Sequence, residues 1–195
     1  MKKNTSALFG FKEWALVCEA LGTGHQSLLL RKGGIAEGRD GFGFEHQEFF
    51  LFPTWFHGQV EKIRLQHASA IPLEAPEELS LEYCATIEWS GLIEDRKKIA
   101  QLEQLHILQE SVINERFSYN AGDGKEGLYV AFVRVYRIHP PIRLPMEKRF
   151  GGCRSWVALP EMPEAAFVSV LSDEEHEARR SKFTRALGLG SMPST

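Results

Sequence analysis

The chain of 195 residues contains no apolar run that approaches the roughly 18 residues needed to cross a membrane. Lys12 and Glu13 interrupt the apolar stretch after the basic start MKKNTSALFGF, so the apolar core of a signal peptide is missing. Three cysteines lie far apart, with no C-x-x-C pair and no histidine at zinc-finger spacing. These absences predict a cytoplasmic protein with no membrane partner. Its free thiols are Cys18, Cys84 and Cys153, two of them buried and one in a turn.

Signatures of catalysis are also missing. There is no G-x-S-x-G nucleophile elbow, and the glycines of GTGHQ and KGGI have neither the spacing of a dinucleotide loop nor a Walker lysine with its hydroxyl. A carboxylate nuclease needs an acidic residue followed closely by E-x-K, and Glu61-Lys62 after Glu48 has the wrong spacing. The sequence therefore predicts no cofactor and no metal, and it favours a non-catalytic protein without deciding the question.

The composition is that of an ordinary globular protein, with 43% apolar and 25% charged residues in a mass of 22.1 kDa. This length is sufficient for a sizeable core. We expect one α+β domain over residues 1–160, a C-terminal helical appendage over 161–190 and a disordered tail over 191–195. Oligomeric state is left open.

Charge is distributed unevenly along the chain, whose formal net charge is -3. Acidic residues outnumber basic ones twelve to five between Ile71 and Glu126, whereas Gly127 to Pro160 has six basic residues and only Glu147. The net charge argues against a protein that coats nucleic acid without regard to sequence. The late basic segment either forms a local basic surface or pairs with the acidic middle of the chain.

Hydrophobic spacing predicts three helices. One covers Gly10 to Leu21, where Gly22 is able to end it in the left-handed conformation, and one covers Asp95 to Leu105. The third is opened by the capping box of Ser172 and Glu175, runs to Leu187 and is closed by Gly188.

Strands are predicted from alternation and from apolar runs. The ranges are Ser27–Lys32, Glu45–Phe52 stopped by Pro53, Leu79–Ser90, a central strand Leu128–Ile138 ended by Pro140 and Pro141, and Ser155–Leu159. Residues 37–44 read as a flexible hairpin loop. The fold class is therefore α+β: a mixed or antiparallel barrel-like sheet of five or six strands, a packed N-terminal helix and an outer C-terminal helix.

One candidate site lies in the segment EHQE. Glu45, His46, Glu48 and the later His57 are ligand types for a divalent metal or for acid–base chemistry. On a strand, His46 and Glu48 share one face and Glu45 points to the other. The alternative is a polar stripe facing solvent, opposite Phe49 and Leu51.

A second candidate site combines cationic and aromatic side chains. Its members end the first strand, precede a loop or begin a late strand, positions where binding residues gather at one end of a sheet: Arg31, Lys32, Arg116, Tyr119, Arg154 and Trp156. Guanidinium groups fork onto phosphates or guanine edges, and aromatic rings stack on bases. In the alternative, Trp156 fills the core, Arg154 pairs with a carboxylate and Tyr119 caps the end of the barrel.

The segments FKEWALVCEALGTGHQSLLLRKGGI, FFLFPTWFHG, RFSYN, GLYVAFVRVYRIHPP and FGGCRSW resemble one bacterial family of domains of unknown function, over Phe11 to Leu159. This resemblance implies a bacterial protein, associated with restriction-type defence systems, and transfers no catalytic residue. The order of elements also resembles the PUA-like and ASCH-like β-barrel superfamily, which includes the pseudouridine-synthase-associated RNA-binding domain. That likeness implies a pocket between the first helix and the barrel that recognises a base or nucleotide.

Three functions follow as hypotheses. The first is a non-catalytic module that binds nucleic acid or a nucleotide through the cationic–aromatic set. A second is a metal-dependent hydrolase or nuclease that uses His46 and Glu48. In the third, a structural or partner-binding protein, a large apolar patch around Phe49 to Phe56 would be exposed.

Overall fold

A computed structural model describes residues 8–32, 43–64, 74–119, 126–152 and 154–190. The strands are β1 Leu8–Trp14, β2 Leu28–Lys32, β3 Glu48–Thr54, β4 Glu78–Ile93, β5 Leu128–Pro145, β6 Trp156–Leu159 and β7 Ala166–Ser169. The helices are α1 Ala15–Gly22, α2 Arg96–Ala100, α3 Glu110–Phe117 and α4 Asp173–Leu187, with 3-10 turns η1 His57–Lys62, η3 Glu103–Leu105 and η4 Lys148–Phe150.

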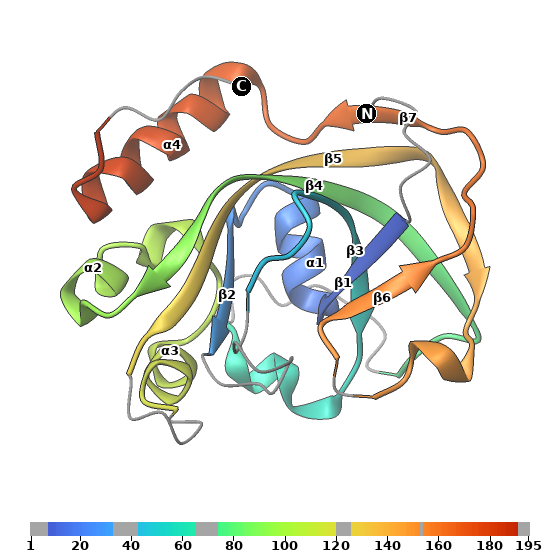
Figure 1. Cartoon of the computed structure of the whole chain (residues 1–195), viewed down its shortest axis with the longest axis horizontal. Coiled ribbons are helices and arrows are strands. Elements are labelled where there is room, and N and C mark those ends of the chain that lie inside the picture. Colours follow the sequence, from blue (N-terminus) through green and yellow to red (C-terminus); the bar gives the residue numbers. More distant parts are fainter. Residues whose placement is uncertain (1–7, 33–42, 65–73, 120–125, 153, 191–195) are drawn as a thin grey trace.

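The strands form one seven-stranded mixed sheet in the order β2-β5-β4-β3-β1-β6, with β7 paired to β5. Only β1 and β3 run parallel among the pairs of described strands. The sheet curls around α1 as a half-barrel, and α4 lies on its outer side (Figure 1). The predicted α+β class and barrel-like sheet are confirmed, with more strands than expected.

The long strand β5 is central, as predicted, because β2 and β4 flank its first half. Pro140 and Pro141 do not end it. Residues 138–141 fall in a register shift between β5 and β4, and Ile138 and His139 pair with β7 instead. A proline without an N–H is tolerated where the ladder to a neighbour is interrupted, so the strand continues to Pro145.

The predicted first helix begins too early. Residues from Gly10 to Trp14 belong to β1, which pairs with β3 on one side and β6 on the other, and the helix begins at Ala15. Phe11 and Trp14 have a helical spacing, but backbone pairing with β3 and β6 on the two sides holds this segment in an extended conformation. Gly22 lies inside α1, and the positive φ of 76° belongs to Gly24.

Other boundaries differ less. The strand predicted from Glu45 begins at Glu48 and passes through Pro53 to Thr54. Asp95 caps α2 by accepting the Lys97 N–H at 2.9 Å. The capping box that opens α4 and the left-handed Gly188 that ends it are confirmed, whereas α3 and β7 were not predicted. Most of the loop 37–44, Cys153 and the tail 191–195 lie outside the described residues.

Two groups of buried side chains form the core. The larger one surrounds Leu16, Leu21 and Phe132, and it includes Phe183 of α4. A smaller one surrounds Phe52, Leu81 and Phe150 beyond β3. Because Phe183 is completely buried, α4 packs on the same core as the sheet.

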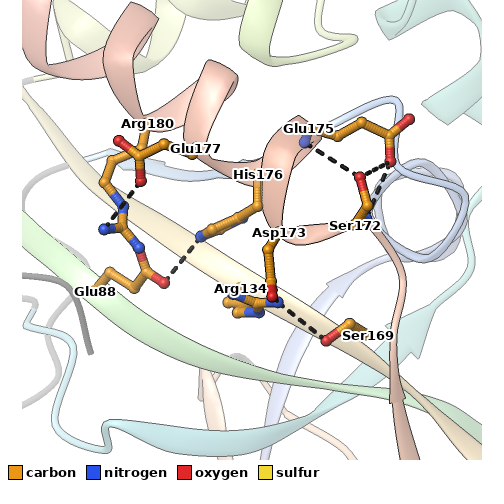
Figure 2. Close-up of polar contacts among 9 residues, drawn as sticks. All are labelled: Glu88, Arg134, Ser169, Ser172, Asp173, Glu175, His176, Glu177 and Arg180. Carbon is orange, nitrogen blue, oxygen red and sulfur yellow. Dashed lines mark hydrogen bonds and ion pairs between the residues drawn. The ribbon is translucent and has the colours of Figure 1, made fainter.

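A buried charged network fixes α4 to β4 (Figure 2). His176 Nε2 lies 2.9 Å from Glu88 Oε1, and Arg180 Nη2 lies 3.1 Å from Glu88 Oε2. All three side chains are less than a tenth exposed, at 6% for Glu88, 3% for His176 and 8% for Arg180. At the start of α4, Arg134 of β5 pairs with Asp173 (Figure 2).

The carboxylate of Glu88 carries its charge because of these partners. Burial alone raises the pKa of Glu88, but the hydrogen bond from His176 and the charges of His176, Arg180 and Arg134 outweigh it, so the pKa is lowered. A carboxyl group with a lowered folded pKa stabilises the fold above its ordinary pKa. That contribution is lost as pH falls through the folded value.

We predict that Glu88→Gln lowers the free energy of unfolding by about 3 kcal/mol at pH 7, because it leaves the buried Arg180 guanidinium without its buried counter-charge. The deficit shrinks below pH 4.5, the ordinary value for glutamate. Urea denaturation at pH 7 and pH 3.5 measures both. Glu177→Gln is the control, since Glu177 contacts Arg180 at 3.2 Å but its side chain is 57% exposed. Equal stabilities of Glu88→Gln and Glu177→Gln at pH 7 would contradict the role of the network.

Candidate anion site at the end of the barrel

The carboxyl ends of β1 and β2 meet the last turn of α3 at one end of the half-barrel. Arg116 of α3 donates from Nη1 to the carbonyl of Leu30 in β2 at 2.5 Å, and β2 ends beside α3 (Figure 1). Arg31, the next residue of β2, reaches β1, where its Nη2 donates to the carbonyl of Lys12. Two guanidinium groups therefore reach this end from different elements.

Arg31 is held without using all of its donors. Its guanidinium carbon lies 4.7 Å from the centre of the Phe11 ring, and its Nε lies 3.8 Å from Glu13 Oε2. Arg31 Nε is buried and has no hydrogen-bond acceptor among the described residues. A guanidinium group has five N–H donors and no acceptor, so a buried Nε–H without a partner is costly.

Arg116 is only 9% exposed, and its guanidinium carbon lies 4.5 Å from the centre of the Trp14 ring. Burial lowers the pKa of Arg116 to about 10; the charge of Glu13 opposes this effect and that of Arg31 adds to it. Arg116 is therefore still a cation at neutral pH. The two arginines are close enough for their charges to interact.

Glu13 lies between the two arginines and is only 2% exposed. Its Oε1 accepts the Trp14 N–H at 2.9 Å at the start of α1, while its Oε2 faces Arg31. The carboxylate also favours the charged form of Arg116. Arg31, Arg116 and Glu13, which we call the buried charge set, leave one positive charge in excess.

Lys32 and Tyr119 form the outer part of this region. The Lys32 ammonium lies 3.9 Å from the centre of the Tyr119 ring, which supports a cation–π contact. Tyr119 is 40% exposed, so it is one of the large apolar side chains that remain open to solvent. An exposed ring beside a lysine offers a base a surface on which to stack.

Trp156 packs among other rings, as the structural alternative supposed. Its ring centre lies 4.7 Å from that of Phe11 and 5.2 Å from that of Phe49. Its indole Nε1 is buried without an acceptor in the described part of the chain. Phe11 thus contacts both Trp156 and Arg31. Arg154 is exposed, and no contact joins it to the buried charge set within the described ranges.

The structure does not assemble the predicted His46–Glu48 site. Residues 45–47 are not in a strand, so the face argument fails. His46 stacks on Phe9 with ring centres 3.6 Å apart, while Glu48 borders a shallow depression of about 500 Å³ on the outer face with Thr86, Glu88 and Arg134. No group of three or more metal-ligating side chains occurs among the described residues, and His57 joins none.

Burial and pairing also bear on two alternatives that the sequence left open. The apolar patch expected around Phe49 to Phe56 is not exposed over Phe49–Phe52, where each side chain is at most 3% accessible. In the late basic segment, Arg143 pairs with Glu78 of the acidic middle, Arg134 with Asp173 and Arg149 with Glu147. Half of the six basic residues of that segment are therefore in ion pairs.

Sequence reasoning missed Glu13 and Trp14. Both lay inside the predicted helix, where Glu13 served only as an interruption of an apolar run. A two-residue period through Phe11 and Glu13 would have placed them on one face of a strand, but the helical spacing of the following residues masked it.

The chain is similar to several known proteins. A family model described as "Domain of unknown function (DUF1802)" matches residues 10–182. Among solved structures, the ASCH protein of Zymomonas mobilis matches with 13% identity, 80% of this chain, 89% of that chain and a TM-score of 0.48. A serine-to-alanine mutant of that protein matches with 13% identity, 80% of this chain, 89% of that chain and a TM-score of 0.49. For a tyrosine-to-phenylalanine mutant the identity is 14%, the coverage is 80% of this chain and 92% of that chain, and the TM-score is 0.46. No curated protein matches the chain significantly. None of the described helices is long and apolar enough to span a membrane.

His106 provides a test of the positive charge near the site. Burial lowers the pKa of His106 to about 3, with further contributions from the charges of Arg64 and Arg116. The unfolded chain takes up a proton at the ordinary value of 6.5, so stability falls as pH decreases from that value, by up to about 1.4 kcal/mol per pH unit.

We predict that NMR titration finds the His106 ring neutral down to about pH 4. In Arg116→Gln, which removes one of the nearby charges, the His106 pKa rises. Arg96→Gln is the control, since Arg96 also lies near α3 but bonds to the exposed side of Asn114. A His106 ring that titrates near pH 6.5 in the folded protein would contradict this placement.

Proposed function

The chain belongs to the DUF1802 family of domains of unknown function, and because membership supplies no activity, we propose a function from the geometry: a non-catalytic module that binds nucleic acid or a nucleotide. The proposed ligand meets the buried charge set and its rim. The contact residues are Arg31, Lys32, Arg116 and Tyr119, with Arg154 and Trp156 as a second group on the β6 side.

The excess of buried cationic donors supports this proposal most strongly. Glu13 pairs with Arg31 and its charge favours the charged form of Arg116, and Arg31 Nε has no acceptor among the described residues. A closed structural ion pair would balance its charges. An anion with several acceptor oxygens, such as a phosphate, neutralises the positive charge that Glu13 does not balance and accepts hydrogen bonds from the guanidinium groups.

Aromatic rings beside the cations narrow the class of anion. Tyr119 is 40% exposed and adjoins Lys32, and Trp14 is half-buried beside Arg116. Base stacking on such rings, combined with phosphate contacts from Lys and Arg, is the mode in which single-stranded nucleic acids bind proteins. Inorganic anions do not use the rings, so we propose a ligand that has both a phosphate and a base.

We predict that a fluorescently labelled single-stranded oligonucleotide binds the full chain at low salt and that its binding weakens as salt rises. Tyr119→Ala costs about 1 to 3 kcal/mol of binding free energy because it removes the ring on which a base stacks. Lys32→Gln makes the dependence of log K on log salt shallower by about 0.7, since one cation no longer neutralises a phosphate. Anisotropy titrations between about 50 and 200 mM salt measure both effects.

The control for these variants is Arg143→Gln, since the Arg143 side chain is 72% exposed and pairs with Glu78 away from the site. It should leave affinity unchanged. Arg154→Ala separately tests the β6 side. The proposal fails if no single- or double-stranded oligonucleotide binds at low salt, or if Tyr119→Ala and Lys32→Gln bind as tightly as Arg143→Gln.

A further inference from the structure

We propose that Glu13 sets the net charge of the buried site to one, so that the site accepts an internal phosphodiester of a nucleic-acid strand in preference to a terminal phosphate. This inference rests on the proposed function and chooses between the two ligand classes that it leaves open. A phosphodiester carries one negative charge, whereas a phosphate monoester carries about 1.5 to 2 at pH 7.

The charge that faces the ligand is fixed by three buried side chains. Arg31 is 14% exposed at its side chain, Glu13 is 1% exposed at its side chain, and Arg116 is 9% exposed. Two positive charges and one negative charge leave one positive charge where solvent screens little. A single anionic charge neutralises this set, and a second one would be buried without a partner, which is costly.

Neighbouring charges in the described part of the chain do not alter this count. The ammonium of Lys12 points to the opposite side of β1, where it donates to the carbonyls of Gly151 and Gly152 at 3.1 and 3.0 Å. Lys32 adjoins the exposed Tyr119, and the side chain of Glu115 is 70% exposed, so solvent screens both.

The arginines also have contacts other than Glu13, so the charge of Glu13 can be removed while these contacts remain. Arg31 donates to the carbonyl of Lys12 and lies over Phe11, and Arg116 donates to the carbonyl of Leu30 and lies over Trp14. A glutamine at position 13 is still able to accept the Trp14 N–H. Glu13→Gln therefore raises the site charge to two while the arginines stay in place.

The first test needs no variant. The second ionisation of a nucleoside 5′-monophosphate has a pKa of about 6, so the ligand passes from dianion to monoanion as pH falls from about 7.5 to about 5.5. A dinucleoside monophosphate keeps one charge throughout. We expect the affinity of the full chain for the nucleoside monophosphate to rise at least about fivefold over this range, and that for the dinucleoside to stay within about twofold.

The diester arm controls for titration of the protein. Two titratable groups near the buried charge set interact with it and with one further charge each: Cys18 of α1 with Glu13, Arg31 and Glu19, and His106 with Arg116 and Arg64. Glu115 of α3 acts on Arg116, and Lys32 of β2 adjoins Tyr119 at the rim. Burial raises the pKa of Cys18 and lowers that of His106 to about 3, so neither changes charge in this range. Any effect of the other groups appears in both ligands alike.

The second test uses Glu13→Gln, with Glu115→Gln as the matched control at an exposed carboxylate beside Arg116. At pH 7.5 Glu13→Gln should favour the nucleoside monophosphate over the dinucleoside by about tenfold or more relative to wild type, or about 1.4 kcal/mol. Glu115→Gln should leave that preference unchanged. If Glu13→Gln does not fold, the pH test on the wild type decides alone.

The outcomes separate this inference from the proposed function. If the wild type binds the monophosphate dianion more tightly than the diester, or if Glu13→Gln leaves the preference unchanged, the charge assignment is overturned and nucleic-acid or nucleotide binding stands. If neither these ligands nor oligonucleotides bind the wild type, the proposed function itself fails.

Discussion

The burial of one carboxylate between two guanidinium groups determines how the end of this half-barrel is built. Glu13 is nearly inaccessible, and an isolated carboxylate in such a place is strongly unfavourable. Arg31 from β2 and Arg116 from α3 compensate it, so three elements have to meet at one point. Two further hydrogen bonds join neighbouring elements here. Gln59 of η1 accepts the Leu16 N–H of α1 at 3.2 Å, and Thr54 of β3 donates to the carbonyl of Glu13 at 3.0 Å.

Two buried charged groups within the described residues, one at α4 and one at the end of the barrel, differ in how completely they are balanced. At the base of α4, Glu88 has both His176 and Arg180 as partners, and Arg134 reaches Asp173 (Figure 2). That network joins a helix to the outer face of the sheet over a core that includes Phe183. At the end of the barrel, Arg31 and Arg116 have the carboxylate of Glu13 between them, whereas Arg180 alone has both Glu88 and Glu177. A buried Nε–H without an acceptor in the described residues occurs in both groups, at Arg31 and at Arg180, so the difference lies in the charges. We therefore assign a structural role to the first group and propose ligand binding for the second.

Much of the sheet could be predicted because β4 alternates between buried and partly exposed side chains and the first half of β5 is apolar on both faces. β1 could not be predicted, since Phe11, Trp14 and Cys18 fit a helical period. The local sequence does not specify the pairing of β1 with β3 and β6. α3 and β7 are short, with eight and four residues, and only tertiary contacts select them. The arginines of the site were predicted from their places at strand ends and before a loop. The carboxylate of Glu13 was not predicted as part of the site, because its role depends on Arg31 of β2 and Arg116 of α3, which tertiary packing brings close to it.

Arg31 Nε–H has no acceptor among the described residues, and we propose that a bound phosphodiester supplies one. Proton–nitrogen correlation spectra of arginine side chains report this group directly, with Arg31→Lys identifying its signal. On addition of a dinucleoside monophosphate, the Arg31 Nε–H signal should move downfield and exchange more slowly with water, while that of Arg143, which pairs with Glu78 at 2.8 Å, stays in place. An Arg31 signal that does not move at ligand concentrations that saturate binding would contradict the claim.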